Sequence, residues 1–129
     1  MNDYNLKSKW VLWYHSLKNT NWDNKSYIKV IELKTLLDYK LLEEILRINH
    51  LQNGMFFLMK GVIFPTWEDP KNRMGGCVSL KYDNNILKEF LRIILLCITG
   101  NLSTDGNLNE INGISISPKK EFNITKIWL

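Results

Sequence analysis

The chain of 129 residues lacks the features that mark metal proteins, secreted proteins and membrane proteins. Its two cysteines, Cys77 and Cys97, form no Cys-x-x-Cys pair, and neither histidine is close to them in sequence, so we expect no zinc site and no disulfide framework. No apolar run approaches the ~20 residues of a transmembrane helix, and residues 1–10 hold no apolar core of signal-peptide length. We therefore expect a protein of the reducing cytoplasm, with the nucleus as the alternative.

Catalytic patterns are missing as well. The sequence has no Gly-rich phosphate loop, no Gly-x-Ser-x-Gly and no metal-spaced His/Cys set. The adjacent carboxylates Glu43 and Glu44 lie among leucines of a predicted helix, where a solvated helix face is the usual interpretation. We therefore expect neither an enzyme nor a bound cofactor.

What is present is a globular composition rich in tryptophan. The chain is 45% hydrophobic and 12% aromatic, enough to bury the core of one domain. The net charge of +4 is compatible with an anionic partner, but many ordinary proteins share it. The five tryptophans are Trp10, Trp13, Trp22, Trp67 and Trp128.

The hydrophobic pattern predicts six strands and two helices in the order β-β-α-β-β-α-β-β. This order favours an α+β fold, an antiparallel sheet with both helices on one face. Thr35 and Asp83 are candidate helix caps, and Gly100 is a candidate helix end. The strands are expected at 9–15, 27–33, 55–60, 77–82, 113–117 and 123–129, and the helices at 35–47 and within 83–100.

Two tryptophans fall in polar loops, Trp22 in residues 19–24 and Trp67 in residues 65–70. Each ring could simply fold back onto the core. Two indoles that face each other could instead stack on both faces of a flat ring, and a positive charge on that ring would add ~0.5–2 kcal/mol per face. Two such loops, both after strands that could share one sheet, favour the stacking interpretation.

Stacking does not distinguish bases, and Glu68 could supply the missing selectivity. A carboxylate accepts two parallel hydrogen bonds, which suits the N1–H and the exocyclic amine of guanine. An ordinary surface carboxylate is the alternative. Lys119 and Lys120 could hold phosphates that follow the base, although lone lysine pairs are usually just solvated.

The chain resembles the eukaryotic translation initiation factor 4E family, the cytoplasmic proteins that bind the cap of messenger RNA. Its most specific stretch is PTWEDPKNRMGG at 65–76, which is similar to the family signature WEDxxNxxGG. KWVLWYHS at 9–16 resembles the first strand of the family, and NTNW at 19–22 its first cap-loop tryptophan. LLCITG at 95–100 and ITKIWL at 124–129 follow in family order.

The resemblance implies a curved sheet with its helices on the convex face, and a role for each site residue. Trp22 and Trp67 would sandwich the 7-methylguanine, and Glu68 would recognise its edge. Trp128 would lie beside the N7-methyl group, and Lys119 falls where the family places a phosphate-binding arginine. Trp10 and Trp13 would be structural.

The resemblance also has gaps in the phosphate-binding set. Cys77 stands where the family commonly has a basic residue, and Ile124 where it has a lysine. Lys120 or Arg73 could compensate. We expect phosphates to contribute less to binding than in typical members.

The resemblance implies a partner surface on the helices, for a scaffold factor 4G or an inhibitory protein with a helical motif. A family tryptophan there falls on Lys40, and a family glutamate on Ile93. Leu36, Leu96 and Gly100 are retained. Binding of the standard motif is therefore doubtful.

We expect residues 1–129 to form one cap-binding-like domain that lacks the last helix and strands of the family. Two alternatives remain open. One is a degenerate member that acts as a decoy or repressor, and the other is a general nucleotide or RNA binder without methyl selectivity.

Overall fold

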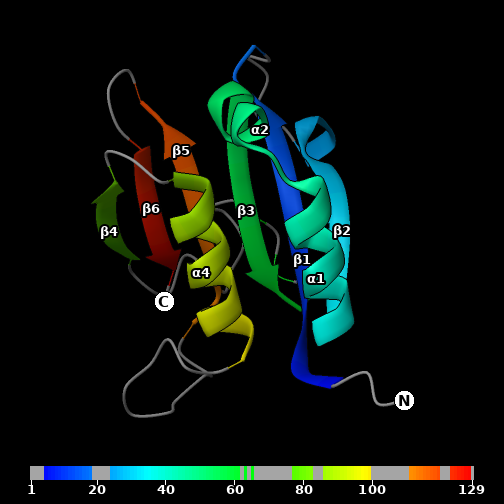
Figure 1. Cartoon of the computed structure of the whole chain (residues 1–129). Helices are drawn as coiled ribbons and strands as arrows, with labels where there is room; N and C mark the ends of the chain where they lie inside the picture. The colour runs from blue at the N-terminus through cyan, green and yellow to red at the C-terminus, as the bar shows by residue number, and fades with distance from the viewer. Residues whose placement is uncertain are drawn as a thin grey trace.

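A computed structural model describes residues 5–18, 24–61, 63, 65, 77–82, 86–99, 111–119 and 123–128. Its centre is an antiparallel sheet of six strands in the order β2-β1-β3-β5-β6-β4. The helices lie in front of this sheet (Figure 1). The strands are β1 (Asn5–Ser16), β2 (Ile28–Thr35), β3 (Gly54–Lys60), β4 (Cys77–Tyr82), β5 (Gly113–Pro118) and β6 (Asn123–Trp128).

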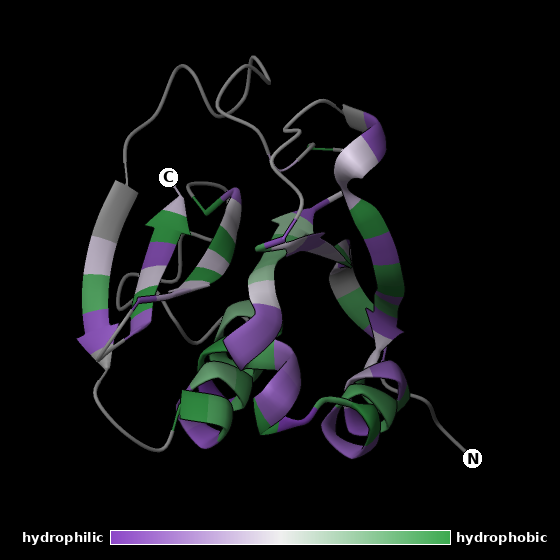
Figure 2. Ribbon diagram, turned by 90° about the horizontal axis from the view of Figure 1, so that it is seen from above, coloured by the Kyte–Doolittle hydropathy of each residue, from purple (hydrophilic) through white to green (hydrophobic). Residues whose placement is uncertain are grey.

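The helices α1 (Leu36–Ile45), α2 (Ile48–Asn53) and α4 (Ile86–Ile98) gather on one side of the sheet. Figure 2 shows the two ends of the sheet curling away from them, so that the helical face is convex and the opposite face concave. The predicted α+β class, the antiparallel sheet and the convex helical face are confirmed. Asp83 and Gly100, the candidate cap and end of the second helix, lie outside the described residues.

The start of α1 follows from a capping box. The Thr35 hydroxyl accepts the Asp38 backbone N–H, while the Asp38 carboxylate accepts the N–H groups of Lys34 and Thr35. These bonds satisfy backbone donors that the first turn leaves unpaired. The predicted cap at Thr35 is therefore confirmed, and it turns the chain from β2 directly into the helix.

The short helix α2 was not predicted. Its six residues present one buried side chain, Leu51, so they show no helical repeat in the sequence. The Nδ1 atom of His50 accepts the Arg47 backbone N–H at 2.9 Å and supports the first turn. Gly54 follows, at a point where a Cβ atom would collide with the Tyr14 ring and with the backbone of His15.

Strand alternation divides the sheet into two faces. Trp10, Leu12, Leu58 and Ile114 are buried against the helices. The core on this side also takes in Leu42 and Tyr39 of α1, Leu51 of α2, and Phe90, Ile94 and Cys97 of α4.

The Tyr39 hydroxyl connects the two longer helices. It donates to the Leu91 carbonyl oxygen at 2.9 Å. Burial, and then the charge of Glu43, raise the pKa of Tyr39 to about 12, so the hydroxyl stays protonated as a donor. Glu43 and Glu44 are exposed, which agrees with the predicted solvated helix face.

Candidate ligand-binding face

A chain of aromatic rings crosses the concave face of the sheet. His15 of β1 meets Tyr27 at 5.0 Å between ring centroids, and Tyr27 meets Phe57 of β3 at 5.7 Å. Phe57 in turn meets Trp128 of β6 at 6.4 Å, with the rings at 82°. Edge-to-face contacts of this kind hold each ring in a defined orientation. The four rings form a rigid aromatic floor, in which His15 and Phe57 are buried while Tyr27 and Trp128 are partly exposed.

Trp128 is further fixed by a hydrogen bond. Its indole Nε1–H donates to the Ser115 hydroxyl at 3.1 Å. Because tryptophan has one donor and no acceptor, its polar atom is satisfied within the protein. The ring can then contribute to a ligand only through its π-surface and its apolar edge.

His15 is completely buried and bonds at both ring nitrogens. Nδ1 lies 3.0 Å from the Ser16 carbonyl oxygen, which can only accept, so Nδ1 carries a proton and donates. Nε2 lies 3.0 Å from the Ser26 hydroxyl. The imidazole therefore ties β1 to the 3-10 turn η1 (Asn24–Ser26), which begins two residues after Trp22.

Two predicted base-binding or phosphate-binding residues fall in the described part of the chain. Trp128 lies on the concave face, as given above. Lys119 is exposed just after β5, at the hairpin end remote from Trp128. The remaining candidates, Trp22, Trp67, Glu68, Arg73 and Lys120, lie outside the described residues, so their mutual geometry stays a prediction.

The candidate partner residues are spread over α1 and α4. Lys40 is exposed, and Leu36 and Leu96 are partly exposed. Ile93 is only 5% exposed and packs in the core. Gly100 lies outside the described residues.

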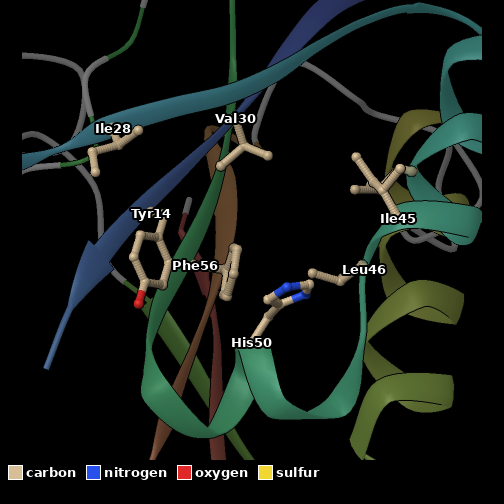
Figure 3. A pocket seen from close by; sticks show the side chains of 8 residues that line it. Tyr14, Ile28, Val30, Ile45, Leu46, His50 and Phe56 are labelled. Carbon is tan, nitrogen blue, oxygen red and sulfur yellow. The ribbon is translucent and has the colours of Figure 1, made fainter.

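A pocket of about 450 Å³ opens on the helical side of the sheet, between β1, β2 and β3 and the helices α1 and α2. Figure 3 shows His50 and Leu46 on the helical wall, facing Tyr14 and Phe56 on the sheet. Its rim carries exposed apolar side chains, with Ile28 57% exposed and Ile45 45% exposed. Val30 and Leu42 complete the lining.

Sequence reasoning missed two features of the concave face. The first is Lys126, an exposed lysine of β6. Its place on the face of Trp128 could have been predicted, because residues two apart on a strand share a face and Lys126 precedes Trp128 by two. The hydrogen bond between His15 and Ser26 had no readable signal, since it depends on how residues 16–27 fold back.

Two classes of site are absent from the described residues. In the segments that the structure describes, no group of three His, Cys, Asp or Glu side chains could hold a metal ion. In the same segments no helix is long and apolar enough to cross a bilayer. Cys97 is a free thiol, and burial raises its pKa to about 12.

Comparison with known proteins gives a consistent result. The family model of eukaryotic initiation factor 4E matches residues 5–129. A eukaryotic translation initiation factor 4E homolog of Acanthamoeba polyphaga mimivirus is 24% identical over 87% of this chain and 50% of its own length. The eukaryotic translation initiation factor 4E of Xenopus laevis is 25% identical over 95% of this chain and 60% of its own length.

The fold is also that of solved structures. A crystal structure of schistosome eIF4E complexed with m7GpppG and 4E-BP superposes with a TM-score of 0.87 at 21% identity. The match covers 100% of this chain and 73% of the schistosome chain. This chain thus spans 50% to 60% of the length of the two curated relatives. With the family model matched along nearly the whole sequence, the chain belongs to the eukaryotic initiation factor 4E family.

Proposed function

We propose that this chain binds the 7-methylguanosine cap of messenger RNA, without catalysis, and acts in translation initiation or its regulation. The observation that carries the proposal is the aromatic floor, in which Ser115 and Phe57 orient Trp128 on the concave face. Family membership and the crystal structure of the schistosome relative complexed with m7GpppG support it.

In the proposed mechanism, Trp22 and Trp67 stack on the two faces of the methylated guanine. The methyl group gives the ring a positive charge, so cation–π attraction strengthens stacking over that of unmethylated guanine. The Glu68 carboxylate accepts from N1–H and the exocyclic amine, which excludes adenine. Trp128 offers its apolar edge to the methyl group, since its N–H is already bonded to Ser115.

Fluorescence titration tests this proposal. We expect 7-methyl-GTP to quench tryptophan emission at concentrations at least ~10-fold below those needed for GTP, as two cation–π faces imply. Trp67→Ala and Glu68→Ala should each abolish selective binding. Glu43→Gln, which removes an exposed carboxylate on α1, is the matched control and should bind as the wild type does.

The same titration separates the alternatives. Absence of quenching by either nucleotide would favour a decoy or repressor that keeps only the fold. Equal quenching by the two nucleotides would favour a general nucleotide or RNA binder. Either result would overturn cap recognition.

We propose in addition that the helical side binds a protein partner. The specific observation is the apolar pocket between α1, α2 and the sheet, with Ile28, Val30 and Ile45 exposed at its rim. The schistosome relative is complexed with 4E-BP, which supports a regulatory protein as the partner class. Lys40 is exposed on the outer face of α1, where the family has a tryptophan. A partner therefore makes a less favourable contact with this outer face than with the pocket.

A further inference from the structure

Strand register places one lysine on the concave face beside Trp128. Lys126 of β6 lies directly opposite Ser115 of β5 and Ser79 of β4. Residues directly opposite each other in an antiparallel pair project from the same face. The hydrogen bond from Trp128 to Ser115 shows that both share the concave face, so Lys126 projects there as well.

The surroundings of Lys126 suit an anion. The residue is exposed, and its two cross-strand neighbours are serines, which can donate hydroxyl hydrogen bonds. Among the residues that the structure describes, no carboxylate lies within ion-pair distance of it. Lys81 of β4 is two positions along from Ser79 and projects from the same face.

Distance favours Lys126 over the lysines of the hairpin turn. A strand rises ~3.3 Å per residue, so the backbone of Lys126 is ~7 Å from that of Trp128. Asn123, where the turn enters β6, is ~17 Å from Trp128 by the same measure. Lys119 lies beyond that end of the hairpin. A flexible lysine stem therefore brings the Lys126 ammonium to a ligand at Trp128 more directly.

We propose that Lys126 binds the phosphate chain of the nucleotide whose base lies at Trp128. This inference rests on the proposed cap binding and assigns its phosphate subsite to the strands β5, β6 and β4. Ser115 is buried, so the phosphates cannot reach its hydroxyl, whereas Ser79 is exposed and can donate to them. The lysine thus takes over a charge that Cys77 and Ile124 do not supply.

The test compares Lys126→Met with Lys88→Met by calorimetric titration of 7-methylguanosine, 7-methyl-GMP and 7-methyl-GTP. Methionine keeps a similar stem, and Lys88 is an exposed lysine of α4, on the opposite side of the sheet. Lys126→Met should lose ~10-fold in affinity for the triphosphate and less than ~2-fold for the nucleoside, because only the ammonium–phosphate bond is removed. Its salt dependence should fall by ~0.7 in log–log slope. Lys88→Met should match the wild type.

The outcomes are distinguishable. If the wild type gains affinity from nucleoside to triphosphate and Lys126→Met gains equally, the assignment of Lys126 is wrong while cap binding stands. If the wild type binds none of the three ligands, cap binding itself fails, and the assignment fails with it. Lys126→Arg keeps the charge, so its retention of triphosphate affinity would support the assignment independently of folding effects.

Discussion

The ring nitrogens of His15 and Trp128 all bond within the protein, which makes the two side chains supports rather than polar ligand contacts. His15 bonds to Ser16 and Ser26, and Trp128 bonds to Ser115. Because every ring nitrogen already has a hydrogen-bond partner, the two rings do not rotate to meet a ligand. A preorganised aromatic floor loses less conformational entropy when a flat ring binds on it.

The bond between His15 and Ser26 should couple the two residues energetically. We expect His15→Phe and Ser26→Ala each to lower the free energy of unfolding by ~1–2 kcal/mol, since each leaves a polar partner unsatisfied. The double variant should lose less than the sum, because both single changes break the same bond. Urea unfolding of the four proteins measures this.

Additive losses, within ~0.5 kcal/mol, would show that the bond contributes nothing of its own. Cap affinity gives a second readout. His15 anchors the turn that follows Trp22. We therefore expect each single variant to lose more binding free energy for 7-methyl-GTP than free energy of unfolding.

Among the elements, α1 and α2 form the wall of the apolar pocket, which sets where a partner could dock. Their inner residues Leu42 and Leu46 are buried, whereas Ile45 is left at the rim. Burial of one such isoleucine by a partner side chain is worth ~1.5–3 kcal/mol. The pocket can therefore hold one or two partner side chains, and their burial would supply enough free energy to anchor them.

An aspartate at the rim should weaken partner binding selectively. We expect Ile45→Asp to reduce capture of 4E-BP in a pull-down by at least ~10-fold, because a charge would be desolvated against apolar contacts. Leu17→Asp, at an exposed leucine in the turn after β1, is the control and should leave capture unchanged. Equal capture by wild type and Ile45→Asp would exclude the pocket as the docking place.

Most elements were predictable because their local patterns agree with the fold. Short β-prone or alternating runs predicted β1 to β6, and Thr35 as a candidate cap marked the start of α1. The neighbour relations were not predictable, since β4 pairs with β6 rather than with the preceding β3. Of the candidate site, the sequence motifs indicated Trp128, but the partners that orient it, Phe57 and Ser115, come from distant strands.

For the whole molecule, two buried groups of the helical core contribute a loss of stability at alkaline pH. The pKa of Cys97 rises from its ordinary 9.0 to about 12 through burial, and that of Tyr39 rises from 10.0 to about 12 through burial and then Glu43. In both cases the folded state holds its proton more tightly than the unfolded state. Their contribution to stability is complete below pH ~9 and is lost as the pH rises toward ~12.

Unfolding by urea at a series of pH values between about 8 and 11 tests this expectation. The free energy of unfolding should fall with rising pH, and Cys97→Ala should flatten the decline between pH ~9 and ~10, where the unfolded thiol ionises first. Cys77→Ser is the control background. A wild-type profile that stays level to pH ~11 would contradict the buried, protonated state of both groups.

The strand order also bears on how the chain matures during synthesis. Among the described strands, β4 pairs only with β6, so once made it must wait while α4 and β5 emerge. The aromatic floor is likewise incomplete until Trp128 can reach Phe57. Pairing between segments so far apart in sequence is slow compared with helix formation. A nascent chain that has not yet released β6 from the ribosome therefore lacks the aromatic floor.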